Sequence, residues 1–164
     1  MSAIALSTLL QRRDIWRGDR GPHALPGVVA SGWSALDAAL PGHGWERGSV
    51  TELLVPGPGQ GELSLLLPTL ARLTQAGQQV ALIAPPMPPY PPAWQSAGVE
   101  LSRLVWVVTS SPREQLWAVE QSLREPACAC VLSWFAQALP DKQGRRLQVA
   151  AGAGDGLGFV VQAR

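Results

Sequence analysis

The chain has few charged residues, and this shortage excludes several classes of protein. Charged residues make up 15% of the 164 positions and hydrophobic residues 46%, a balance that excludes a disordered, solvating chain. The net charge of +1 excludes a general electrostatic attraction to nucleic acid, so any contact with DNA must be local. The sequence also lacks a secretory leader and an apolar run of membrane-spanning length, which predicts a cytoplasmic protein.

Cysteine is almost absent, since Cys128 and Cys130 are the only two. They alternate within an apolar run, so both thiols are expected on the same face of a strand. Adjacent positions of one strand have poor geometry for a disulfide, and no second pair supplies further metal ligands. We therefore expect two buried free thiols rather than a disulfide or a metal site.

Tyrosine and phenylalanine are also scarce, with one and two residues, whereas tryptophan occurs seven times. Trp16 lies among arginines near the N-terminus. The other six lie at the ends of expected elements or inside apolar runs, where a packed indole is usual. This pattern predicts that six tryptophans belong to the core, namely Trp33, Trp45, Trp94, Trp106, Trp117 and Trp134.

The length suits one domain, preceded by an arm. We expect an amphipathic arm over 1–20, a linker rich in proline and glycine over 21–30, and the core over 31–164. The arm either folds back on its own domain or anchors in the groove of a partner. Its candidate partner-binding residues are Leu9, Leu10, Arg12, Arg13, Ile15, Trp16 and Arg17.

The core sequence predicts an α/β fold with a parallel, doubly wound sheet. Helical segments separate the apolar runs, and two of these helices are expected to begin with a capping box, Ser34 with Asp37 and Ser111 with Glu114. The expected strands cover 50–55, 80–84, 104–108, 127–132 and 157–161.

The glycine-rich stretch 56–63 lies between a strand and a helix, which is the context of a phosphate-binding loop. Such a loop needs a lysine for the phosphates and a hydroxyl for magnesium, but these positions hold Glu62 and Leu63. A carboxylate facing a polyphosphate would repel it. We therefore expect a vestigial loop that binds no cofactor, formed by Pro56, Gly57, Gly59, Gly61, Glu62 and Leu63.

These segments resemble the RecA family of ATPases and, more closely, its ImuA branch of accessory proteins in bacterial error-prone translesion synthesis. The resemblance implies a RecA-like parallel sheet flanked by helices, with a degenerate phosphate loop, in a core that is short at its C-terminal end. The stretches that carry it are 9–17, 32–48, 62–73, 84–92, 97–104 and 159–164. Residues 62–162 are also similar to the SulA family of cell-division inhibitors.

The resemblance implies that the ATPase chemistry is lost. Pro86 stands where the family has its catalytic glutamate, and the magnesium-ordering aspartate would fall near Ser133 or Trp134. Gln162 matches the glutamine that senses the nucleotide, but is equally well a polar residue at a strand end. Without base, lysine and metal ligand, phosphoryl transfer has no machinery, so we expect no catalytic residue and no metal.

The leading hypothesis is a non-catalytic accessory protein of SOS-induced DNA repair and mutagenesis. By resemblance its partners would be the polymerase-like protein ImuB, RecA and a DnaE-type error-prone polymerase, together with possible self-association. The main alternative is a SulA-like inhibitor that binds the division protein FtsZ. Two further alternatives are a residual nucleotide-dependent enzyme and weak DNA binding through the arginines of the arm, which Asp14 and Asp19 oppose.

Overall fold

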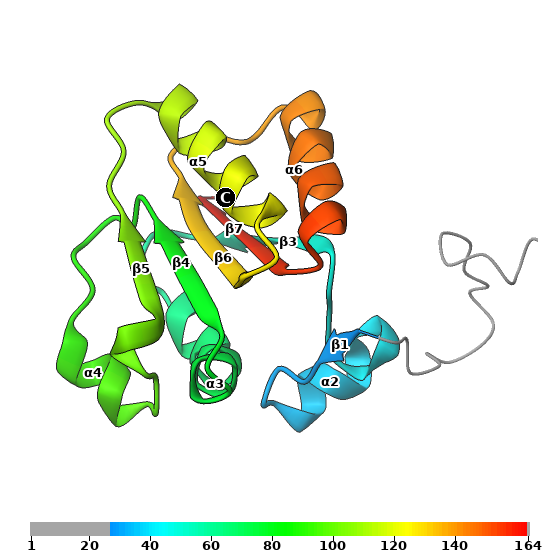
Figure 1. Cartoon of the computed structure of the whole chain (residues 1–164), viewed down its shortest axis with the longest axis vertical. Coiled ribbons are helices and arrows are strands. Elements are labelled where there is room, and N and C mark those ends of the chain that lie inside the picture. The colour runs from blue at the N-terminus through cyan, green and yellow to red at the C-terminus, as the bar shows by residue number, and fades with distance from the viewer. Residues whose placement is uncertain (1–26, 164) are drawn as a thin grey trace, which may run out of the picture.

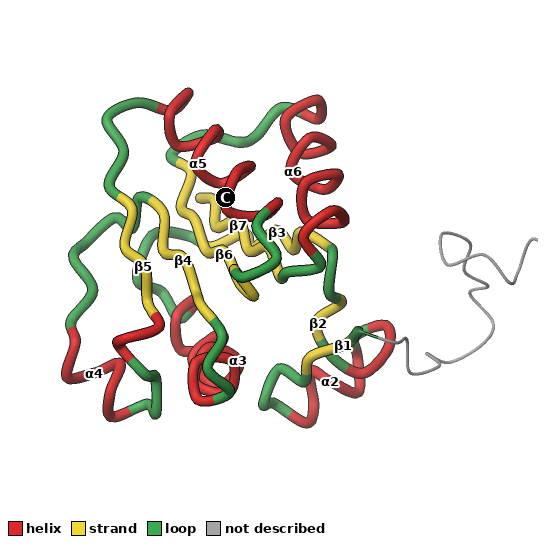
Figure 2. The backbone as a smooth tube through the Cα atoms, in the orientation of Figure 1, coloured by secondary structure: helices red, strands yellow, loops and turns green. Residues whose placement is uncertain are grey.

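The computed structural model describes residues 27–163, in which five parallel strands form one sheet (Figure 1, Figure 2). The strand order is β3-β7-β6-β4-β5, so β3 and β5 are the two edges. This arrangement confirms the predicted α/β class and its parallel sheet. The strands are β3 (Ser49–Val55), β4 (Gln79–Ile83), β5 (Leu104–Val107), β6 (Cys128–Phe135) and β7 (Leu157–Ala163).

Helices cover both faces of the sheet, with α3 and α4 on one side and α5 and α6 on the other (Figure 1). The two sides have separate cores, because successive side chains of each strand point to opposite faces of the sheet. The helices are α3 (Glu62–Gln75), α4 (Pro91–Ser96), α5 (Pro112–Arg124) and α6 (Asp141–Gly154), and a 3₁₀ turn, η2 (Leu101–Arg103), precedes β5. None of the helices within 27–163 is long and apolar enough to cross a membrane.

Helix α3 is held to the sheet by leucines spaced three and four residues apart. Leu66 and Leu70 are completely buried, and Leu73 is nearly so, against β4, β6 and β7. On the same side Trp45 packs edge-on against Phe159, with ring centroids 5.1 Å apart. This apolar face holds α3 in place, and it fixes where the preceding loop lies.

A small antiparallel ribbon precedes the sheet and was not predicted. Its strands are β1 (Val28–Val29) and β2 (Trp45–Glu46), joined through helix α2 (Ser34–Ala39) and the 3₁₀ turn η1 (Pro41–His43). Val28 and Val29 thus pair with β2, although they fall inside the segment expected to be a linker.

The predicted capping box of Ser34 and Asp37 is wrong. Trp33 is the N-cap of α2 and makes no side-chain cap. The Asp37 carboxylate instead accepts a hydrogen bond from the Ser31 amide at 2.8 Å, while the Ser31 hydroxyl accepts one from the Trp33 amide. These side chains therefore bond the amides of the turn before the helix, and not the two amides that a capping box would satisfy.

The capping box at the start of α5 is confirmed in its first half. The Ser111 hydroxyl accepts a hydrogen bond from the Glu114 amide at 3.2 Å, and Pro112 occupies the first helical position. The Glu114 carboxylate reaches one residue further back than expected, to the amide and hydroxyl of Ser110.

Both cysteines are buried free thiols, as predicted, but they do not share a face. Gln79 pairs with Cys128 and Val80 with Cys130, so Ala129 is an extra residue in β6. This bulge reverses the alternation, and Cys128 packs with α5 and α6 while Cys130 packs with α3. Burial raises the pKa of both thiols, which makes them poor nucleophiles at neutral pH.

Candidate functional site

The loop between β3 and α3 lies at the carboxyl edge of the sheet, where parallel α/β folds bind their ligands. The covering helices change sides between the neighbouring strands β4 and β6, and a cavity of about 540 Å³ opens at their ends. Pro58 of the loop, Trp134 of β6, Gln162 of β7 and Gln115 of α5 all line it. The loop and this cavity form the candidate ligand site.

Glu62, the first residue of α3, points into the loop rather than into solvent. Its side chain is 3% exposed. One carboxylate oxygen, Oε1, accepts hydrogen bonds from the Gly59 amide at 2.7 Å and from the Trp134 indole at 3.2 Å. The other oxygen, Oε2, is buried and has no protein partner. The loop is therefore folded around this carboxylate.

The surroundings of Glu62 favour its charged form. Burial raises the pKa of this carboxyl. Hydrogen bonds from the amides of Gly59, Glu62 and Gln60 and from the Trp134 indole lower the pKa by more, so it lies below its ordinary value. The N-terminus of α3 adds partial positive charge at the same place. The buried carboxylate is consequently an anion held by neutral N–H donors.

The sequence predicted a carboxylate that would face, and repel, a bound polyphosphate. The structure instead turns Glu62 inward, because the loop amides and the helix N-terminus attract an anion. Sequence reasoning missed Trp134 as a donor to this group. The only signal for it was its position near the expected metal ligand, and a tryptophan in an apolar run is usually part of the core.

The other predicted strand-end positions serve as internal cross-links. The Ser133 hydroxyl donates to the Ile83 carbonyl at 3.0 Å and accepts from the Gln115 amide group at 2.9 Å. Gln162 donates to the Glu52 carboxylate at 2.6 Å and accepts from the Leu139 amide at 3.1 Å. These contacts connect neighbouring elements and leave little capacity for a ligand.

The structure thus brings together the predicted loop residues, with Glu62 buried, Leu63 packed against the core and Gly59 and Gly61 at positive φ. Within 27–163, no group of three or more His, Cys, Asp or Glu side chains could hold a metal. The predicted partner-binding residues of the arm lie outside the described residues, namely Leu9, Leu10, Arg12, Arg13, Ile15, Trp16 and Arg17.

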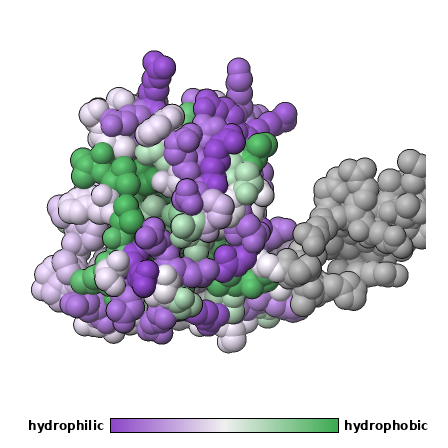
Figure 3. Space-filling view, in the orientation of Figure 1, coloured by the Kyte–Doolittle hydropathy of each residue, from purple (hydrophilic) through white to green (hydrophobic). Residues whose placement is uncertain are grey.

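A second candidate surface follows the edge strand β5. Val105 is 43% exposed, Trp106 51% and Val108 74%. Val105 and Trp106 point to opposite faces of the sheet at this edge, and we call the three side chains together the β5 surface. Figure 3 shows apolar surface running along this strand. The core assignment is wrong for Trp106, and also for Trp33 and Trp117, which are 47% and 61% exposed. It holds for Trp45, Trp94 and Trp134, which are buried.

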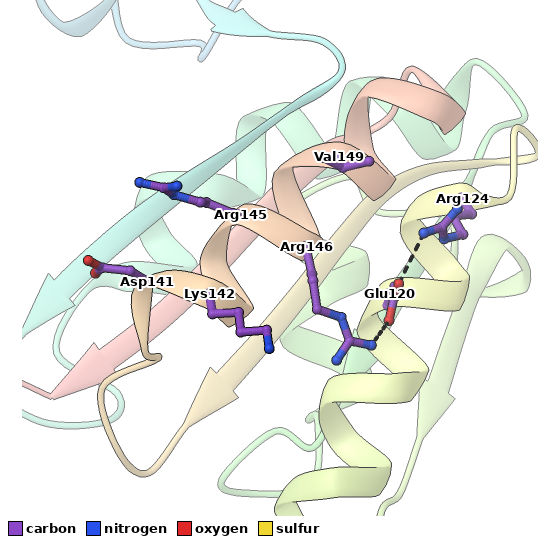
Figure 4. A pocket seen from close by; sticks show the side chains of 7 residues that line it. All are labelled: Glu120, Arg124, Asp141, Lys142, Arg145, Arg146 and Val149. Carbon is purple, nitrogen blue, oxygen red and sulfur yellow. Dashed lines mark hydrogen bonds and ion pairs between the residues drawn. The ribbon is translucent and has the colours of Figure 1, made fainter.

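A polar groove of about 590 Å³ separates α5 from α6 on the opposite side of the sheet from α3 (Figure 4). Glu120 of α5 accepts hydrogen bonds from Arg124 and from Arg146 of α6. Burial raises the pKa of Glu120, and the two guanidinium groups lower it by more. This ion-pair group joins the two helices, so its first role is structural.

Comparison with known proteins identifies relatives of this architecture. The family model "Cell division inhibitor SulA" matches residues 48–158. The SulA proteins of Citrobacter koseri and Klebsiella pneumoniae are each 30% identical over 98 residues, which is 60% of this chain and 58% of theirs. The chain therefore aligns with less than two thirds of these relatives.

The fold agrees with a solved member of the same family. The crystal structure of SulA from Pseudomonas aeruginosa superposes with a TM-score of 0.59 at 25% identity, covering 70% of this chain and 98% of that one.

These findings overturn the ImuA interpretation, and with it the expected role in translesion synthesis and the partners ImuB, RecA and DnaE-type polymerase. Part of the evidence for ImuA lay in the arm and in 32–47, which precede the matched region. Within that region the family match and the relatives' names agree. The chain belongs to the SulA family of cell division inhibitors.

Proposed function

We propose that this protein is a non-catalytic inhibitor of cell division that acts by binding FtsZ, as part of the SOS response to DNA damage. The observation that carries the proposal is the β5 surface on a SulA-family fold. A tryptophan and two valines are exposed along this edge strand, which suits protein docking. A tryptophan that becomes buried when a partner binds contributes strongly to the affinity of the interface.

The two edges of the sheet differ in a way that favours β5. The β3 edge carries the Glu52 carboxylate, and a charge on an edge strand discourages pairing with another chain. Leu104–Val107 contains no charged residue, and Val108 extends the apolar run. The partner is therefore expected to meet β5 rather than β3.

We further infer that the β3–α3 loop is a degenerate phosphate-binding loop of RecA type. Its support is the strand, loop and helix context, with Glu62 and Leu63 at the positions of the lysine and the hydroxyl. Isothermal calorimetry with ATP and magnesium at millimolar concentration should show no saturable heat. Binding at micromolar nucleotide would revive the residual-enzyme alternative.

The decisive experiment measures FtsZ polymerisation and GTPase rate with matched surface variants. Val108→Asp places a charge in the proposed interface, whereas Val149→Asp makes the same change at a similarly exposed valine of α6. We expect Val108→Asp to abolish inhibition and Val149→Asp to retain it, because a desolvated unpaired charge weakens an interface strongly. Circular dichroism checks that both variants fold.

Trp106→Ala and Trp117→Ala form a second matched pair, since both indoles are more than half exposed. Only the first should weaken inhibition, by roughly tenfold or more as for a typical interface hot spot. Equal loss in both variants, or inhibition that survives Val108→Asp, would place the docking surface elsewhere. Failure of the wild-type protein to affect FtsZ at all would refute the function itself.

A further inference from the structure

The position of Glu62 raises the question of why a carboxylate is buried at all. Among 27–163 it is the residue with a buried side-chain oxygen, Oε2, that has no hydrogen-bond partner. Within the described part of the chain no lysine or arginine pairs with it, since both contacts to Oε1 come from uncharged N–H groups. Burying a charge without an ion pair is costly, so the loop must offer a strong compensating field.

That field comes from the backbone of the loop. Gly59 and Gly61 both have positive φ, at 77° and 109°, and this conformation turns the Gly59 amide toward the loop interior. The 14-residue helix α3 begins at the same point, and the amides of its first turn have no helical partners. The Trp134 indole N–H enters from the sheet side.

The arrangement is that of an oxyanion site already filled from within. We propose that the β3–α3 loop is an oxyanion-binding site whose ligand is the protein's own Glu62 carboxylate, and that removing this carboxylate leaves a site for a small free oxyanion such as formate. Glu62 thus closes the loop to external anions. The inference concerns the loop alone and stands whether or not the protein binds FtsZ.

Chemical rescue of Glu62→Ala tests the proposal. The variant should melt at a lower temperature than the wild type, and sodium formate should restore several degrees of the loss when present at about tenfold its Kd. Sodium chloride at equal ionic strength should not. Formate should leave the melting temperature of the wild-type protein unchanged, because its site is occupied.

Glu114→Ala is the matched control. Glu114 also lies in the first turn of a helix and also accepts from a backbone amide, that of Ser110, but its side chain is exposed. Formate should not rescue this variant. Rescue of Glu114→Ala to the same extent, or equal stabilisation of the wild type, would show a general salt effect and overturn the proposal. So would a folded Glu62→Ala protein that formate does not stabilise.

Glu62→Gln keeps the test decisive if the alanine variant does not fold. Glutamine preserves the shape of the side chain and removes its charge, so formate should give no rescue while the Trp134 indole proton, assigned with Trp134→Phe, shifts upfield in the NMR spectrum. An indole signal unchanged from the wild type would show that Trp134 does not donate to a carboxylate. That result would also overturn the proposal.

Discussion

At the scale of single residues, Glu62 makes the acid stability of the protein predictable in sign. Its folded-state pKa lies below the ordinary value of 4.5, so ionised Glu62 stabilises the fold above its unfolded-state pKa. This contribution disappears as the pH falls through the lower, folded-state pKa. The carboxyls of Asp37, Glu114 and Glu120 have lowered pKa values too, so a single stability curve cannot isolate Glu62.

A comparison of the wild-type protein with Glu62→Gln isolates the contribution of Glu62 to the stability. The free energy of unfolding should be smaller in the variant at pH 7, and the gap between the two proteins should narrow below about pH 4.5. Urea unfolding at a series of pH values measures both curves. A gap that stays constant down to pH 3 would mean that Glu62 is already protonated, or solvated, in the folded protein.

Leu66 provides a residue-scale measure of the α3 packing. It is completely buried, so Leu66→Ala should cost about 2–5 kcal/mol of unfolding free energy through lost burial and the cavity left behind. Leu54→Ala is the control, because Leu54 is 57% exposed and should cost below about 0.5 kcal/mol. A loss below about 1 kcal/mol at Leu66 would show that α3 is not seated on the sheet as described.

Tryptophan shows a limit of sequence reasoning at this scale. Trp94 and Trp106 both stand in apolar surroundings in the sequence, yet one is 4% exposed and the other 51%. The difference arises because β5 is an edge strand, and strand order depends on contacts between distant segments. The local sequence pattern therefore could not show that this strand lies at the edge of the sheet.

At the scale of elements, strands and helices were predicted accurately where the apolar pattern extended over several residues. β6 ends three residues later than expected because Ser133 satisfies its hydroxyl inside the sheet, on the Ile83 carbonyl. A serine that looked like a strand end is therefore a buried cross-link. The strands β1 and β2 were missed because each has only two residues, too few to show the alternating pattern of a strand.

The contact between α5 and α6 depends on one glycine, which a pair of substitutions can test. A Cβ at Gly154 would lie 2.1 Å from the Leu123 carbonyl oxygen of α5, whereas a Cβ at Gly144 of the same helix would meet nothing. We expect Gly154→Ala to destabilise by about 1–3 kcal/mol through overpacking. Gly144→Ala should stabilise by about 0.5–1 kcal/mol through higher helix propensity.

Denaturant unfolding of the two variants measures both effects. If Gly154→Ala were neutral, the two helices would have to be free to move apart, and the Glu120 ion-pair group could not be holding them as described.

At the scale of the whole molecule, the sequence predicted the fold class correctly, but the family chosen from it was wrong. The loop 56–63 and the alternation of strands and helices are local features, and they led to the correct fold class. The choice between families depended instead on comparing the whole of 48–158 with relatives, which no single motif can replace.

The arm remains a prediction, and its deletion is the test. We propose that Leu9, Leu10, Ile15 and Trp16 with the neighbouring arginines contact a protein partner rather than the domain. Removing 1–20 should leave the melting temperature nearly unchanged while weakening association in sedimentation or pull-down with FtsZ. If the truncated protein unfolds, or binds as before, the arm is structural or dispensable.

The exposed indole of Trp106 also allows binding to be followed by intrinsic fluorescence. An indole that is half in water emits at longer wavelength and is accessible to a quencher such as iodide, unlike the buried Trp94. In a variant whose other tryptophans are replaced by phenylalanine, complex formation over β5 would shift the Trp106 emission to the blue and protect it from iodide. Titration of that signal would then yield the affinity of the complex directly, without a label.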